Sequence, residues 1–153
     1  MSLPADKLFN VRVYGLLFNE QNEILVAEEK HYNTFIRKFP GGGLQFGEGL
    51  KEAVKREFRE ELTIEIEIIQ HFYTTDFFVS SAFNSKQQVI SIFYFVKSLD
   101  AISENYFRRK PFAELDNGDE QFYWIKISDL KEDDFTFPIE KKVCELLKEE
   151  ISF

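Results

Sequence analysis

Three glutamates on one side of a predicted helix are the residues in this sequence best suited to chemistry. Glu60 and Glu61 follow Glu57 by three and four positions in the stretch Gly41 to Ile64. An α-helix turns about 100° per residue, so side chains at this spacing share one face. Carboxylates this close repel one another, and a hard divalent cation that prefers oxygen ligands relieves the repulsion. The spacing therefore predicts a Mg²⁺ site on this helix.

Neighbouring residues give the same helix a packing face and a partner for one carboxylate. An apolar stripe repeats every four positions beside the acidic face. It consists of Leu50, Val54, Phe58 and Leu62. Arg56 precedes Glu60 by four positions, so it can pair with that carboxylate and fix its orientation. Gly49 suits the N-cap, and Glu52 stands where it can reach back to the cap amide.

A run of glycines leads into this helix. Pro40 is followed by three glycines, Gly41–Gly43, which allow backbone conformations that other residues rarely adopt. Their carbonyl groups can face a cation, and their amides can face phosphate oxygens. Arg37 and Lys38 come just before the glycines and are predicted to bind substrate phosphate. An exposed strand edge explains these two residues equally well.

The pattern of these residues resembles the Nudix box, G-x5-E-x7-R-E-U-x-E-E-x-G-U, in which U is a bulky aliphatic residue. Its positions are occupied by Gly42, Glu48, Arg56, Glu57, Glu60, Glu61 and Ile64. Phe58 stands at an aliphatic position, and Thr63 replaces the last glycine. The resemblance implies a Nudix hydrolase that uses Mg²⁺, or alternatively Mn²⁺, to hydrolyse a diphosphate linkage. The substrate that it implies is a nucleoside diphosphate linked to another moiety.

The same resemblance implies roles for individual residues. The expected metal ligands are Glu57, Glu60, Glu61 and the carbonyl group of Gly41. Arg56 would orient Glu60, and Glu48 would add a water-mediated or structural contact. The general base is left open between a glutamate of this helix, such as Glu60, and two acidic residues of a later loop. Of those two, Glu120 is the first candidate and Asp119 the second.

Two later segments are candidates for contact with the substrate. Arg108, Arg109 and Lys110 form a basic run in the irregular stretch 99–120 of an acidic chain. Arginine side chains match phosphate oxygens, so Arg108 and Arg109 are predicted to bind substrate, with a solvated turn as the alternative. The segment 135–139 offers apolar contact, which suits stacking on a nucleobase if it borders the pocket.

The order of predicted elements indicates one domain, residues 1–153, of α+β type. Strands are predicted at 9–18, 24–27, 64–73, 88–96 and 121–127. The first two are expected to pair as a hairpin, 28–34 is expected to be a loop, and 88–96 to be a central strand covered on both faces. Pro138 opens a last helix, and Thr63 is expected to end the glutamate-rich helix in an ordinary conformation. By resemblance, the fold is the α/β/α sandwich of Nudix domains with a central mixed β-sheet.

Composition limits the functions that this chain can have. Acidic residues number 27 against 19 basic ones, and the net charge of −8 argues against general nucleic-acid or membrane-surface binding. Cys144 is the single cysteine, so we expect a core residue, no intrachain disulfide and a reducing, cytoplasmic location. No signal peptide or apolar run of bilayer length appears. The resemblance suggests a homodimer as one form of assembly. The alternative function is a nucleotide-sensing or interaction module without turnover.

Overall fold

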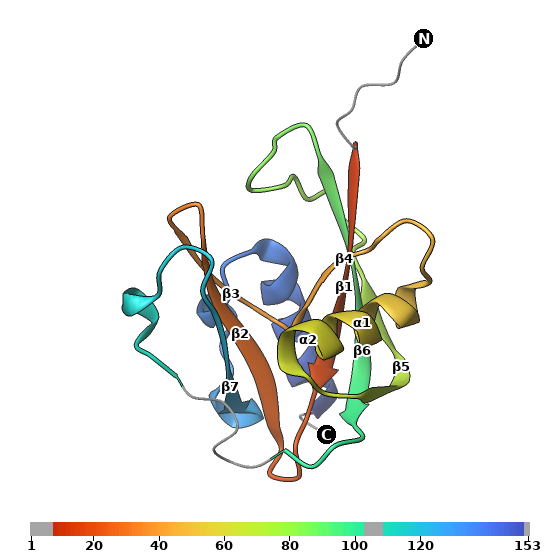
Figure 1. Ribbon diagram of the computed structural model, residues 1–153, viewed down its shortest axis with the longest axis vertical. Coiled ribbons are helices and arrows are strands. Elements are labelled where there is room, and N and C mark those ends of the chain that lie inside the picture. The colour runs from red at the N-terminus through yellow and green to blue at the C-terminus, as the bar shows by residue number, and fades with distance from the viewer. Residues whose placement is uncertain (1–7, 103–108, 152–153) are drawn as a thin grey trace.

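The computed structural model describes residues 8–102 and 109–151, whose arrangement is shown in Figure 1. The strands are β1 (Phe9–Leu17), β2 (Glu23–His31), β3 (Thr34–Lys38), β4 (Gly41–Gly43), β5 (Ile66–Thr74), β6 (Gln88–Ser98) and β7 (Glu120–Lys126). The α-helices are α1 (Leu50–Leu62) and α2 (Pro138–Ile151). The described residues also contain three 3₁₀ helices, one before β7 and two between β7 and α2. They are η1 (Phe112–Glu114), η2 (Ile127–Asp129) and η3 (Glu132–Asp134).

The strands form two sheets. One has the order β4-β1-β6-β5, in which β1 and β6 are parallel, and the other has the antiparallel order β3-β2-β7. The predicted hairpin of 9–18 with 24–27 is therefore wrong, because β1 and β2 belong to different sheets and are joined by an isolated bridge between Phe18 and Ile24. β1 pairs instead along its whole length with the apolar strand β6. That pairing buries more apolar surface than a two-stranded hairpin would.

The two α-helices lie on opposite sides of the sheets, with α1 in front and α2 behind in Figure 1. Buried residues of α1 belong to one core cluster and those of α2 to another. β6 contributes to both, since Tyr94 packs in the first cluster and Phe93 in the second. The predicted central strand, the mixed sheet and the α/β/α arrangement are confirmed. Cys144 is fully buried in the second cluster, as expected for a core residue.

The segment 28–34, which was expected to be a loop, is mostly strand. β2 continues into it and is followed at once by β3, so the turn consists of Tyr32 and Asn33 with φ of 48° and 61°. A two-residue turn with positive φ matches the twist of a β-hairpin. The strand was missed because its charged residues look solvated in sequence. Alternation places Glu28 and Glu29 on opposite faces, where each finds a basic partner.

The expectation of an ordinary conformation at Thr63 is wrong. Thr63 ends α1 in the left-handed conformation, with φ 56° and ψ 39°. Its backbone N–H donates to the carbonyl of Arg59, and the N–H of Ile64 donates to the carbonyl of Phe58. This tight reversal turns Ile64, which is 2% exposed, directly into the core. Burial of Ile64 therefore offsets the strain of a β-branched residue in the left-handed region.

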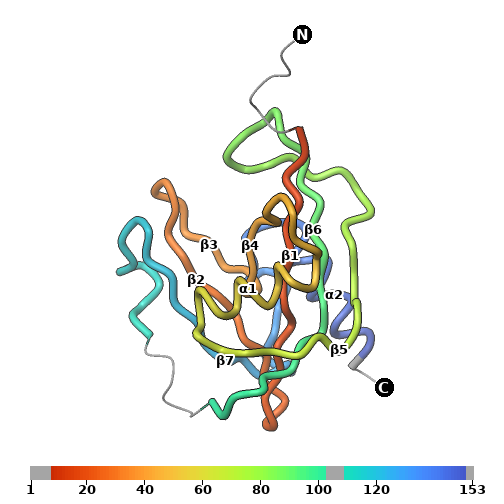
Figure 2. Tube along the Cα trace, turned by 45° about the vertical axis from the view of Figure 1, so that its right-hand side comes forward, coloured from red at the N-terminus to blue at the C-terminus, as the bar shows by residue number. Residues whose placement is uncertain are grey.

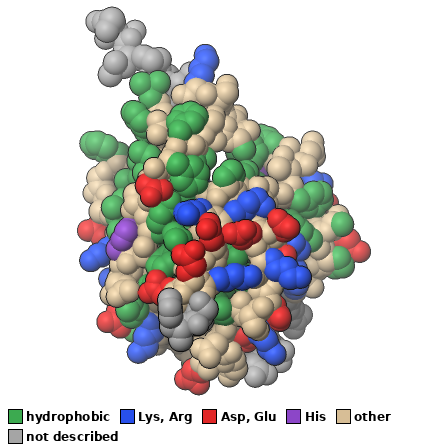
Figure 3. Space-filling view, turned by 180° about the vertical axis from the view of Figure 1, so that it is seen from behind, with side chains coloured by type: hydrophobic (Ala, Val, Ile, Leu, Met, Phe, Trp, Pro, Cys, Tyr) green, Lys and Arg blue, Asp and Glu red, His purple; other side chains and the backbone are tan. Residues whose placement is uncertain are grey.

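The face turned away from the viewer in Figure 1 carries a band of acidic and basic side chains across its middle (Figure 3). Hydrophobic side chains gather above this band, toward the N-terminal end of the molecule. Within the two described ranges, no helix is both long enough and apolar enough to cross a membrane.

Candidate active site

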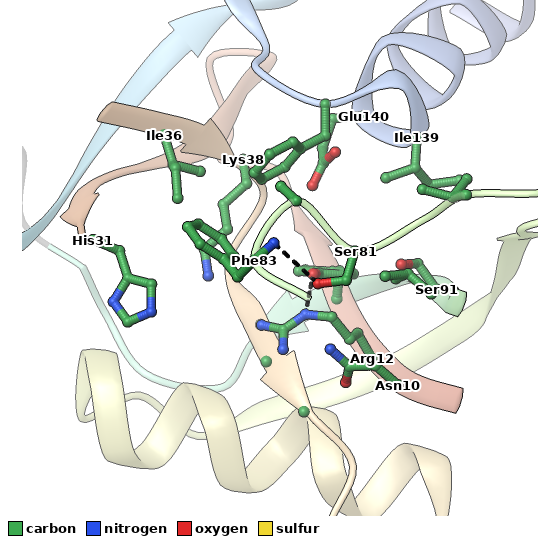
Figure 4. Close-up of a pocket in the computed structure, with 18 of the residues that line it drawn as sticks. Asn10, Arg12, His31, Ile36, Lys38, Ser81, Phe83, Ser91, Ile139 and Glu140 are labelled. Atoms are coloured by element: carbon green, nitrogen blue, oxygen red, sulfur yellow. Dashed lines mark hydrogen bonds between the residues drawn. The ribbon is translucent and has the colours of Figure 1, made fainter. Parts of the chain in front are cut away.

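A pocket of about 400 Å³ lies where β1, β3 and β4 meet the helices α1 and α2. The chain crosses here from β3 in one sheet to β4 in the other, through Phe39 and Pro40 (Figure 2). The acidic face of α1, with Glu57 and Glu61, borders the pocket on one side. The segment 137–140 at the start of α2 borders the other side (Figure 4). One pocket thus adjoins both helices.

The glycines of β4 let the chain pass close to α1 and β1. A Cβ atom on Gly42 would lie 2.5 Å from Oε1 of Glu57, closer than real carbon contacts allow. A Cβ atom on Gly41 would overlap the carbonyl oxygen of Val13. The missing side chain at position 42 is therefore what allows the Glu57 carboxylate to lie at the edge of the pocket.

Arg56 connects the glutamates of the motif to the glycine strand. Its Nε and Nη2 donate to the two carboxylate oxygens of Glu48 at 2.8 and 2.7 Å, and Nη2 also donates to the Gly43 carbonyl at 3.0 Å. Its Nη1 donates to Glu57 at 3.0 Å and to Glu60 at 3.2 Å. The hydrogen-bonded guanidinium lowers the pKa of Glu48 to about 2. Arg56 contacts Glu60 as their spacing predicts, but it holds Glu48 and Glu57 at shorter distances.

Four carboxyl groups from α1, β2 and β7 cluster beside the pocket. Glu61 interacts electrostatically with Glu57 and Glu120, and Glu120 interacts with Glu29, which it faces across β7 and β2. Burial is the main cause that raises the pKa of Glu61 and of Glu120, and neighbouring carboxylates raise both further, while Lys38 opposes the shift. Carboxylates this close repel one another. A divalent cation bound among them would relieve that repulsion.

The residues predicted to bind metal do not all lie in the pocket. Glu57, Glu61 and Gly41 line it, whereas the side chain of Glu60 lies outside the lining and is 57% exposed. Among the residues that the structure describes, no three Asp, Glu, His or Cys side chains are already arranged to hold a metal ion.

A comparison with known proteins assigns this arrangement to a family. Residues 8–146 match the family model of the NUDIX domain. The chain belongs to the Nudix hydrolase family. It is therefore a pyrophosphohydrolase, and the pocket between α1 and α2 is its candidate active site.

Solved structures share the fold of this Nudix hydrolase. A NUDIX hydrolase from Nitrosomonas europaea matches with a TM-score of 0.68 at 18% identity, over 92% of this chain and 89% of that one. A MutT protein from Methanosarcina mazei Go1 matches with a TM-score of 0.66 at 21% identity, over 98% and 99%. An ADP-ribose pyrophosphatase from Streptococcus suis 89-1591 matches with a TM-score of 0.56 at 18% identity, over 90% and 86%. At these identities the likeness shows the fold.

Two arginines predicted to bind phosphate lie outside the lining of the Nudix pocket. Arg37 Nε donates to Glu28 at 2.7 Å, and Arg109 donates to both oxygens of the same carboxylate at 3.1 and 2.9 Å. Glu28 is fully buried and also accepts a hydrogen bond from Gln121. Because side chains alternate along a strand, β3 places Lys38 rather than Arg37 in the pocket.

The remaining predicted site residues also divide between the pocket and the surface. Glu120 belongs to the cluster of carboxyl groups beside the pocket without lining it, whereas Asp119 pairs with Lys110 at 3.2 Å and its side chain is 39% exposed. Arg108 lies outside the described residues. The segment 137–139, part of the apolar run considered for base stacking, lines the Nudix pocket.

Several residues that line the pocket belong to no motif recognised in the sequence. They are Arg12, Glu29, Ser91 and Glu140. Alternation would have placed Glu29 on the same face as Ala27 if the second strand had been extended past its predicted end. No local signal identifies the other three, because their position depends on elements far away in the sequence.

Proposed function

We propose that this Nudix hydrolase cleaves the diphosphate linkage of a nucleoside diphosphate joined to another moiety, using Mg²⁺ or Mn²⁺ and water. The observation that supports this function is one pocket with acidic residues of α1 on one side and apolar residues near α2 on the other. Carboxylates suit a cation that binds a diphosphate. An apolar chamber suits a planar ring. A ligand that fills both parts combines a diphosphate with such a ring.

The donor set at the acidic side fits Mg²⁺. Glu57, Glu61 and Gly41 line the pocket, and Glu120 lies close enough to Glu61 to affect its pKa. We assign these groups as ligands, joined by Glu60 from the exposed edge of α1. The neighbouring carboxylates repel one another, so positive charge is favoured there. Bound Mg²⁺ would supply a Lewis acid that polarises phosphoryl oxygens and orients water.

Basic residues of the pocket wall are suited to position the diphosphate. Lys38 is buried, with Nζ 3.4 Å from a carboxylate oxygen of Glu29. Arg12 lies in the same pocket, and its Nε donates to the hydroxyl of Tyr14 at 2.7 Å. Each side chain retains further N–H donors for anionic oxygens. We therefore assign phosphate binding to Lys38 and Arg12 in place of the arginines that lie outside the pocket.

Glu120 is the residue that we assign as general base. A base must lie within hydrogen-bond reach of the attacking water, directly or through one water molecule. Neither Glu120 nor Asp119 lines the pocket, but Glu120 lies beside Glu61 at its acidic side, which favours Glu120 for this role. Asp119 is instead bound to Lys110 and to the backbone of its own loop.

Turnover of a substrate panel tests the proposed function. The panel contains nucleoside triphosphates, dinucleoside polyphosphates, nucleotide sugars and ADP-ribose, which is included because one protein of similar fold carries its name. We expect nucleotide products from at least one member with Mg²⁺ present and none in excess chelator. Nucleotide binding without turnover of any member would overturn the proposal and favour a nucleotide-sensing module.

A further inference from the structure

Two buried polar atoms line the pocket without a hydrogen-bond partner. They are Oγ of Ser91 on β6 and Oε2 of Glu140 at the start of α2. Ser91 is fully buried, and Glu140 is 1% exposed. Figure 4 shows Glu140 reaching from α2 into the pocket on the side opposite α1. Since nearly all buried polar atoms in folded proteins have a partner, two without one in the same pocket indicate a ligand that completes their hydrogen bonds.

The cations nearest to Glu140 already have other partners. Burial, the main cause, raises the pKa of Glu140 to about 7, although the charges of Lys38 and Arg12 lower it in part. Neither cation forms an ion pair with Glu140 in the described part of the chain. Lys38 pairs with Glu29, and Arg12 donates to Tyr14. The carboxyl group of Glu140 is therefore available to a ligand in the pocket.

The pocket that these two atoms line also has an apolar part. It is formed by Ile36, Val79, Val89, Phe137, Pro138 and Ile139. An apolar chamber with a few polar atoms suits a flat heterocycle, whose faces pack on the wall and whose edge forms hydrogen bonds. A phosphate group is a poor partner for Glu140 itself, because a carboxylate repels it.

We propose that Glu140 and Ser91 hydrogen-bond the edge of the substrate's nucleobase and select bases that carry an exocyclic amino group. An amino group can donate to Oε2 of Glu140, and the adjacent ring nitrogen can accept from the Ser91 hydroxyl. Uracil and hypoxanthine carry a carbonyl oxygen where cytosine and adenine carry the amino group, so they offer the ionised Glu140 carboxylate no donor there. This inference rests on the proposed function, which places a nucleoside in the pocket.

Binding of nucleoside monophosphates without metal tests the inference apart from turnover. Calorimetry at pH 8, where the Glu140 carboxyl group is mostly ionised, compares CMP with UMP and AMP with IMP, pairs that differ at the amino position. We expect the amino member of at least one pair to bind at least about tenfold more tightly to the wild type. Glu140→Met and Ser91→Ala should each abolish that preference, and Glu140→Gln, which keeps an acceptor oxygen, should retain part of it. Glu145→Met is the matched control, since Glu145 lies on the same helix, exposed and outside the pocket.

Two results would overturn the inference. One is equal binding within both pairs by the wild type, and the other is an unchanged preference in the folded variants. If Glu140→Met does not fold, the preference measured for Ser91→Ala decides whether the inference stands. A preference without hydrolysis of any nucleoside diphosphate derivative would remove the proposed function and leave the base site standing. Hydrolysis without such a preference would remove the base site and leave the proposed function standing.

Discussion

The Glu57 carboxylate occupies the space that a side chain at Gly42 would need. A Cβ atom at that position would lie 2.5 Å from Oε1 and 2.6 Å from Cδ of Glu57. Glu57 is itself buried, at 8% exposure, and is held by Nη1 of Arg56 at 3.0 Å. The glycine and the glutamate of the motif are therefore linked by packing as well as by their spacing in the sequence.

Gly42→Ala should displace the Glu57 carboxylate and lower kcat/KM by about a hundredfold, because small displacements of catalytic groups are costly. Circular dichroism and the Tm should show a folded protein. Gly43→Ala is the matched control, since the nearest atom to its Cβ would be Nη1 of Arg12 at 3.7 Å. Equal kcat/KM in the two variants would contradict the role given to this contact.

The assignment of Glu57 and Glu61 as metal ligands predicts a loss of turnover when either carboxylate is replaced by a neutral amide. Glu57→Gln and Glu61→Gln should each lower kcat by roughly a hundredfold or more, because each removes a charged ligand. Glu52→Gln, exposed on the same helix, should behave as the wild type. Rates are measured against added Mg²⁺ or Mn²⁺. Full turnover in excess chelator would refute the metal dependence.

The choice of Glu120 over Asp119 as general base predicts unequal effects at adjacent positions. Glu120→Gln should lower kcat by roughly 10²–10⁴-fold, while Asp119→Asn should change it little. Asp119→Asn removes a surface pair with Lys110 at 3.2 Å, and such pairs contribute little. Steady-state rates of both variants at saturating Mg²⁺ provide the comparison. If both retain wild-type rates, the base belongs to α1.

Burial of Glu140 predicts a dependence of stability on pH. Its pKa is raised from an ordinary value of 4.5 to about 7 in the folded chain. Between these values the folded chain binds more protons at Glu140 than the unfolded chain does, so the free energy of unfolding falls as pH rises. The contribution is fully present below pH 4.5 and is lost above pH 7, with a size of up to about 3 kcal/mol.

Urea unfolding of the wild type and of Glu140→Gln, measured between pH 4.5 and 8, checks this sign. The wild type should lose stability relative to the variant as pH rises. A constant difference between the two proteins across that range would show that Glu140 does not titrate as its burial implies.

The left-handed conformation of Thr63 predicts a gain in stability when a glycine takes its place. Relief of strain is worth about 1–2 kcal/mol, and the greater freedom of glycine in the unfolded chain removes about 0.4–1 kcal/mol of it. Thr63→Gly should therefore raise the free energy of unfolding by about 1 kcal/mol without changing turnover. Thr63→Ala, which keeps the Cβ atom in the left-handed region, should gain less. Chemical denaturation that shows no gain for glycine would mean that Thr63 is not strained.

Local spacing in the sequence was sufficient to predict the helix that carries the glutamates. Its apolar stripe predicted the packing of Val54 and Phe58, which are buried in the core. The contact of Arg56 with Glu60 follows from one turn of helix. These features could be predicted because helical geometry relates residues only a few positions apart.

Contributions from other elements to the pocket were decided by tertiary structure. Glu120 was considered from its position before a strand, but it reaches Glu61 because β7 pairs with β2 and places it opposite Glu29. Lys38 enters the pocket and Arg37 does not, since neighbours on a strand point to opposite faces. Which face turns toward α1 depends on how the whole sheet buries its apolar side, and the five residues of β3 alone do not contain that information.

The end of α1 and the far side of the pocket depended in the same way on distant packing. Thr63 takes the left-handed conformation because Ile64 must reach the core at once. Ser91 and Glu140 line one pocket because α2 packs against the sheet that contains β6. The sequence by itself determined the residues of the motif, their helix and the chemistry open to them. Tertiary structure decided which distant side chains join them, because burial is shared by the whole chain while spacing constrains only neighbours.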